Sequence, residues 1–63
     1  MNDVTEISGL KQNKNLEILD LSYNEIGKIE NLDVNIKIHT LILDSNKIKK
    51  VENLEKIRDL KIL

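Results

Sequence analysis

The 63-residue sequence contains no cysteine and no proline, and Tyr23 is its only aromatic residue. Without cysteine the chain can form no disulfide, and it lacks the Cys/His clusters that hold structural zinc. Hydrophobic residues make up 40% of the sequence, and almost all of them are Leu, Ile and Val. A core in so short a chain supplies roughly a few kcal/mol of stability. These absences exclude a disulfide scaffold and a zinc module, and they leave room for a single small domain.

The chain also lacks a strong charge and a long apolar run. Ten Lys and Arg residues oppose eleven Asp and Glu residues, for a net charge of −1. This balance gives no long-range attraction for nucleic acid or anionic membranes. No signal-like start, 18-residue apolar stretch or Asn-x-Ser/Thr acceptor is present. We therefore expect an intracellular protein, cytoplasmic or nuclear, without direct nucleic-acid or membrane partners.

What the sequence does contain is a repeat with a 22-residue period. Seven positions of one unit recur with their chemical type kept in the next: Leu16, Leu19, Leu21, Asn24, Ile26, Ile29 and Leu32 become Ile38, Leu41, Leu43, Asn46, Ile48, Val51 and Leu54. Such a period is typical of a solenoid, whose units bury their apolar residues only by stacking. The chain divides into a partial repeat 1–15, repeats 16–37 and 38–59, and the start of a further repeat at 60–63. Counting fragments it holds about three repeats, which predicts a truncated piece of a longer array.

The spacing of apolar residues changes within each unit. Leu19-Asp20-Leu21 and Leu41-Ile42-Leu43 alternate with period two, which predicts short parallel strands with the leucines on the buried side. Apolar residues then recur every third position, which favours a 3₁₀ or irregular helical return. The same register puts Leu60 and Leu63 beside Ile38 and Leu41.

Asparagines mark two other recurrent positions. Asn24 and Asn46 follow the strands, where their side chains can bond backbone groups left free by the turn, so we interpret them as a structural asparagine ladder. Asn13 and Asn35 occupy the position that Ile57 holds in the last unit. We expect Val34 or Ile36 to fill the slot at Asn35, and the first coil to be frayed or open to solvent at Asn13.

Residues 16–32 read LEILDLSYNEIGKIENL, and this run resembles the 22-residue class of leucine-rich repeats found in regulatory subunits of protein phosphatase 1 and in axonemal dynein light chains. The resemblance implies an α/β-type solenoid with a parallel sheet on the concave side and 3₁₀ or irregular segments on the convex side. It also implies a non-enzymatic module that binds a protein partner on the concave sheet, without a cofactor, metal or small-molecule substrate. A phosphatase catalytic subunit and a dynein or axonemal component are the partners that it suggests.

If the four leucines point inward, the residues between them form the partner-binding face. Its columns are expected to be Ile18-Thr40-Ile62, Asp20-Ile42 and Ser22-Asp44, with Tyr23 at the rim. Exposed isoleucines either belong to a contact or are ordinary surface residues. Tyr23 either anchors a partner or packs on the neighbouring coil.

Other chemistry-bearing residues lack the partners that a site requires. Asp20 and Asp44 have no nucleophile or activated histidine to complete a catalytic site, and His39 has no metal ligand at a suitable spacing. Lys47, Lys49 and Lys50 form a basic cluster without interleaved aromatic residues, as in an ordinary solvated face. Two alternatives to the scaffold stay open: a nucleoprotein component that holds an RNA-binding protein, and a remnant with no function of its own.

Overall fold

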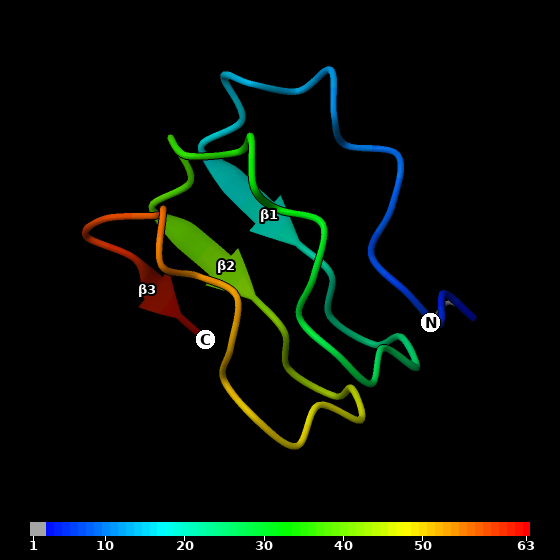
Figure 1. The fold of residues 1–63 in the computed structure, drawn as a ribbon. Coiled ribbons are helices and arrows are strands. Elements are labelled where there is room, and N and C mark those ends of the chain that lie inside the picture. The colour runs from blue at the N-terminus through cyan, green and yellow to red at the C-terminus, as the bar shows by residue number, and fades with distance from the viewer. Residues whose placement is uncertain (1–2) are drawn as a thin grey trace.

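Three short parallel strands line one side of the protein (Figure 1). They are β1 (Ile18–Asp20), β2 (Thr40–Ile42) and β3 (Lys61–Ile62), and they lie side by side in the order β1-β2-β3. The computed structural model describes residues 3–63, so the first two residues of the predicted partial repeat 1–15 lie outside the described residues. The predicted parallel strands are confirmed, each beginning one residue before the expected alternation.

Of the two forms expected for the return segments, 3₁₀ or irregular, the structure shows no 3₁₀ segment within residues 3–63. Residues 3–63 contain no helix, and therefore none long and apolar enough to span a bilayer. Isolated turns place an apolar residue at every third position without a helix. In one example, the amide of Asn35 donates to the Leu32 carbonyl and the amide of Ile38 donates to the Asn35 carbonyl. Elsewhere the return bonds to the neighbouring coil, with the amide of Lys47 donating to the Ile26 carbonyl at 2.9 Å. A backbone bonded between coils needs no helix to satisfy its polar groups.

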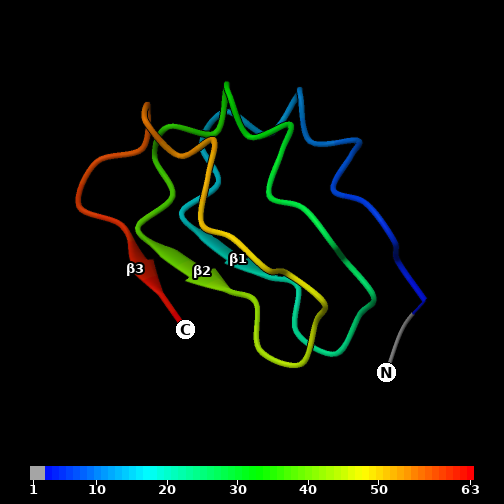
Figure 2. The same ribbon diagram turned by 60° about the horizontal axis from the view of Figure 1, so that its bottom comes forward.

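The coils stack on one another (Figure 2), and the core is a set of aliphatic columns that runs through this stack. Its buried apolar members are Ile7, Leu19, Ile26, Ile29, Leu32, Ile38, Leu41 and Ile57. Leu21 and Leu43 are half-buried against this cluster. Val51 continues the column of Ile29 but is 67% exposed, because no coil within residues 3–63 covers it.

Asn35 overturns the expectation that an apolar neighbour takes its place in the core. It is fully buried, whereas Ile36 is 54% exposed and Val34 is half-buried. The Asn35 amide nitrogen Nδ2 donates to the carbonyls of Leu10 at 3.0 Å and Asn13 at 2.9 Å. These bonds give a second donor to two carbonyls of the preceding turn, which already accept the amides of Asn13 and Leu16, and an isoleucine could not supply it. Asn13, in contrast, is exposed.

The register of β3 differs from the predicted 22-residue offset. Thr40 pairs with Lys61 and Leu41 with Ile62, so each residue of β2 lies beside the one 21 positions later in β3. The offset changes after Ile57. The amide of Ile57 still donates to the Leu54 carbonyl, just as the amide of Asn35 donates to the Leu32 carbonyl one repeat earlier. Asp59 then adopts a left-handed conformation with φ of 53°, whereas its counterpart Lys37 is not left-handed. The predicted pairing of Leu63 with Leu41 is therefore wrong.

Candidate partner-binding face

The strands place a mixed apolar and polar surface on the side of the sheet that faces away from the core. Leu19 is buried while its neighbours Ile18 and Asp20 are exposed. On β2, Leu41 is buried while Thr40 and Ile42 are half-buried. The pairing of β1 with β2 aligns Ile18 with Thr40 and Asp20 with Ile42. We call this outward side of the sheet the open face.

The shortened offset of β3 changes which of its residues extend the open face. Lys61, not Ile62, continues the column of Ile18 and Thr40. Leu63 lies beside Ile42, because its amide donates to the Leu41 carbonyl and its own carbonyl accepts from the amide of Leu43. The expected column Ile18-Thr40-Ile62 is therefore wrong. Ile62 follows Leu19 and Leu41 instead, and it is 40% exposed.

The rim beyond the strands carries carboxylates and Tyr23. Asp44 is exposed, Ser22 is half-buried, and Tyr23 is 57% exposed. Tyr23 has φ of 59°, and its amide donates to the Asp44 carbonyl at 3.0 Å. Ser45, which stands one repeat later, has φ of 60°. The left-handed turn is thus a repeated feature of the coil, and it leaves the tyrosine ring largely in solvent.

Asp20 is held in one arrangement by Ser22. The Ser22 hydroxyl donates to Asp20 Oδ1 at 2.7 Å and the Ser22 amide donates to the same oxygen at 3.0 Å. Bonds from the side chain and then from the backbone of Ser22 lower the pKa of Asp20, because they favour the ionised carboxylate. The open face therefore carries a fixed negative charge at neutral pH. The associated stabilisation exists above the ordinary Asp pKa and is lost as the pH falls through the lowered value.

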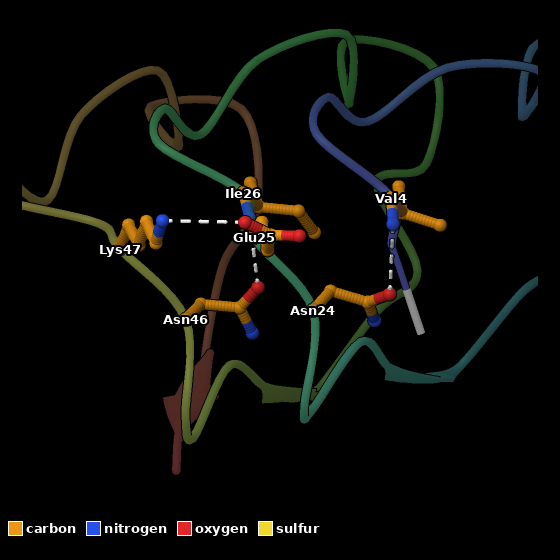
Figure 3. A network of polar contacts seen from close by, with 6 residues as sticks. All are labelled: Val4, Asn24, Glu25, Ile26, Asn46 and Lys47. Atoms are coloured by element: carbon orange, nitrogen blue, oxygen red, sulfur yellow. Dashed lines mark hydrogen bonds and ion pairs between the residues drawn. The ribbon is translucent and has the colours of Figure 1, made fainter. Parts of the chain in front are cut away.

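Asn24 and Asn46 connect successive coils below the rim (Figure 3). Asn46 Nδ2 donates to the carbonyl of Leu21 at 2.8 Å, and Asn46 Oδ1 accepts from the amide of Ile26 at 3.0 Å. Asn24 Oδ1 accepts from the amide of Val4 at 3.3 Å, one coil earlier. These bonds hold the turn against its neighbour and so position the ends of the strands that carry the open face.

A second asparagine ladder on the return segments was not predicted. Asn31 Nδ2 donates to the Ile7 carbonyl and Asn53 Nδ2 donates to the Ile29 carbonyl, both at 2.7 Å. Both asparagines are left-handed, as is Gly9, which stands one repeat before Asn31. The repeated Glu-Asn-Leu triplets and the aligned glycine were the sequence signal for this second ladder.

Some of the remaining titratable side chains lie beside a potential partner of opposite charge at the surface. His39 Nε2 lies 3.4 Å from Glu17 Oε1, and its side chain is 51% exposed. Lys47 Nζ lies 3.2 Å from Glu25 Oε1, which belongs to the equivalent position of the preceding repeat. Within residues 3–63, no three His, Cys, Asp or Glu side chains gather as metal ligands would.

Residues 12–28 match a family model described as a leucine-rich repeat, over less than half of the chain. This match and the small parallel sheet support a leucine-rich repeat protein with that type of fold. No curated protein gives a significant sequence match. Leucine-rich repeat domains generally mediate protein–protein interaction and are typically non-enzymatic, so a protein partner is the expectation that the family match supports.

Proposed function

We propose that this chain is a non-enzymatic interaction module that binds a partner protein on the open face. The observation that supports the proposal is the exposure of an ordered three-stranded surface with apolar and ionised side chains in adjacent columns. Ile18 is 57% exposed beside half-buried Thr40, and the carboxylate of Asp20 stands beside Ile42. Protein contacts usually combine apolar residues with a polar, solvent-accessible rim.

The proposed contact is defined by nine side chains from the strands and the rim. They are Ile18, Asp20, Ser22, Tyr23, Thr40, Ile42, Asp44, Lys61 and Leu63. Lys61 takes the place assigned from sequence to Ile62, beside Thr40, and Leu63 extends the column of Asp20 and Ile42. Asp20 and Asp44 favour a partner with Lys or Arg around an apolar centre, since opposite charges orient the encounter.

The partner proposed first is an intracellular phosphatase catalytic subunit, in line with the repeat class that residues 16–32 resemble. A dynein or axonemal component is the second version of the same proposal. A nucleoprotein role, in which the chain holds an RNA-binding protein, is a further outcome that the same experiment distinguishes.

The test compares partners captured from an intracellular extract by the wild-type chain and by an Asp20→Lys/Ile42→Lys variant. The matched control, Asp33→Lys/Ile36→Lys, makes the same chemical changes at exposed positions outside the strands. The control substitutions should change stability by about 0.5 kcal/mol or less, whereas Asp20→Lys also removes the bonds from Ser22 and Ile42 is half-buried, so the stability of the open-face variant is measured separately by thermal melting. Circular dichroism establishes that all three chains are folded.

We expect the open-face variant to lose the captured protein and the control to retain it. Purified phosphatase catalytic subunit, titrated into each chain in a calorimeter, then tests the first partner directly. RNA recovered only together with a captured RNA-binding protein would favour the nucleoprotein role. Identical partners for all three chains would refute the assignment of the open face.

A further inference from the structure

His39 stands at the entrance to the central strand, next to the open face. It comes directly before β2, as Glu17 comes directly before β1. The amide of His39 donates to the Glu17 carbonyl at 2.8 Å, and the amide of Thr40 donates to the same carbonyl at 3.3 Å. The backbone therefore holds His39 close both to Glu17 of the preceding coil and to Thr40 of the open face.

The imidazole ring of His39 meets a different side chain at each of its nitrogens. Nε2 lies 3.4 Å from Glu17 Oε1, and Nδ1 lies 3.0 Å from the hydroxyl oxygen of Thr40. A carboxylate can only accept a hydrogen bond, so the proton of the neutral ring belongs on Nε2. Nδ1 is then the acceptor, and the Thr40 hydroxyl donates to it.

Protonation of the ring reverses the hydrogen bond with Thr40. An imidazole takes up its second ring proton between about pH 5 and 8. Both nitrogens of the charged ring are donors, so Nδ1–H donates to the Thr40 oxygen and the hydroxyl proton is released for another acceptor. In the neutral state Thr40 thus presents only lone pairs to a partner, whereas in the charged state it presents a donor.

His39 is the only histidine of the chain, and histidine is the side chain that ordinarily changes charge in this pH range. Asp20 stays ionised throughout the range, because the bonds from Ser22 lower its pKa. The charged side chains on the segments that flank His39 are Glu17 in the preceding coil, Lys37 on its own segment, and Asp59 and Lys61 in the following coil. The ring of His39 is therefore the group beside the open face that responds to a change of pH near neutrality.

We propose that protonation of His39 weakens partner binding on the open face, so that the partner is held near neutral pH and released in acid. This inference rests on the proposed function, in which the partner carries Lys or Arg around an apolar centre. A basic partner supplies donors, and these fit the lone pairs that Thr40 presents in the neutral state. Protonation directs a donor at them and adds a positive charge beside the contact, so both effects oppose binding.

The first measurement follows the ring of His39 by NMR in the full chain without a partner. The ring nitrogen shifts distinguish the two neutral tautomers and the charged form. We expect the proton on Nε2 at about pH 8 and protons on both nitrogens at about pH 5.5. Thr40→Val removes the hydroxyl and should shift the Nδ1 signal at about pH 8 far more than the Nε2 signal. A neutral ring protonated on Nδ1, or an Nδ1 signal unchanged by Thr40→Val, would overturn the proposal.

The second measurement compares capture from one intracellular extract at about pH 7.5 and about pH 5.5 by the wild-type, His39→Gln and Thr40→Val chains. The readout is the amount of the protein that Asp20→Lys/Ile42→Lys fails to capture, as a ratio of wild type to His39→Gln at each pH. This ratio cancels any titration of the partner itself. We expect it to fall about three- to fivefold at the lower pH, as for one exposed charge. Thr40→Val should keep only the part of the fall that the charge causes, and thermal melting at both pH values checks that each chain is folded.

The results separate this inference from the proposed function. If nothing is captured, or if Asp20→Lys/Ile42→Lys captures the same proteins, the proposed function fails and the regulation fails with it. If capture depends on the open face but the ratio stays constant or rises at the lower pH, the function stands and the role of His39 is refuted. A complete fall retained in Thr40→Val would refute the reversal of the hydrogen bond at Thr40.

Discussion

At the scale of single residues, Asn35 shows how a polar side chain can replace an aliphatic one in a solenoid core. Its two N–H donors reach the carbonyls of Leu10 and Asn13, but its Oδ1 is buried without a hydrogen-bond partner. Both carbonyls also accept a backbone amide, from Asn13 and Leu16, so Asn35 adds a second donor to each. Each added bond contributes about 0.5–1.5 kcal/mol, against a cost of about 1–3 kcal/mol for the unpaired oxygen. The contribution of Asn35 therefore depends on its donors.

Replacing Asn35 by Asp should destabilise the protein by at least about 2 kcal/mol at pH 7, measured by urea unfolding. The substitution removes both donors and directs a buried charge at two carbonyl oxygens. Because burial raises the pKa of such a carboxyl, the deficit relative to wild type should shrink as the pH falls through that raised pKa. Asn13→Asp, at an exposed position, serves as the control and should stay within about 0.5 kcal/mol of wild type. Equal losses at both positions would contradict this account of Asn35.

At the scale of the elements, the return segment is shaped by repeated left-handed residues. Gly9, Asn31 and Asn53 share positive φ values at equivalent positions of successive repeats, and the two asparagines also bond the preceding coil. A left-handed conformation costs most residues about 1–2 kcal/mol, while Gly adopts it freely and Asn tolerates it. This explains why a return without a helix still repeats its path closely.

Two substitutions at Asn53 separate the backbone effect from the hydrogen bond. Asn53→Gly should cost about 1 kcal/mol through loss of the bond to Ile29, whereas Asn53→Ala should cost about 1 kcal/mol more through strain. At Asn15, which is not left-handed, Ala should be at least as stable as Gly. Urea unfolding of the four variants measures both differences. The same order of Ala and Gly at the two sites would show that φ at Asn53 does not matter.

At the scale of the whole molecule, stability depends on contacts between coils. Leu41 is fully buried and lies between Leu19 and Ile62 in the paired strands. Each coil contributes one layer of a shared column, so a defect in the central coil affects both neighbours. A chain of this size has little stability in reserve.

Leu41→Ala should therefore unfold a large fraction of the protein at room temperature. Truncating a buried leucine costs about 2–5 kcal/mol, which is comparable to the whole stability expected here. Ile36→Ala removes an isoleucine that is 54% exposed and should leave the protein folded. Circular dichroism and thermal melting distinguish the two variants. A folded Leu41→Ala chain with an unchanged melting temperature would rule out the column as the main source of stability.

Much of the fold could be predicted because its elements are local and periodic. The alternation around Leu19 and Leu41 predicted the two complete strands, and parallel pairing follows when equivalent units stack. Between the two expected forms of the return, 3₁₀ or irregular, the sequence could not choose, because apolar spacing by three describes which side chains face the core without determining the backbone path. Isolated turns and left-handed asparagines produce the same spacing.

The candidate face was less predictable at its edge than at its centre. Ile18, Asp20 and Ile42 follow from alternation within each strand, whereas the position of Ile62 depended on the alignment of two strands. The segment that contains the left-handed Asp59 reduces the offset between β2 and β3 from 22 residues to 21. A shift of one residue turns each side chain to the other side of a strand. Nothing in the 22-residue period indicated this change.

The sequence by itself determined the period, the buried leucine columns and the likeness to leucine-rich repeats, because these depend on spacing along one chain. The tertiary structure decided three further features: the shortened register of β3, the burial of Asn35, and the choice of Lys61 and Leu63 for the open face. Each depends on which backbone groups of a neighbouring coil are close enough to bond. That proximity is settled only when the coils stack.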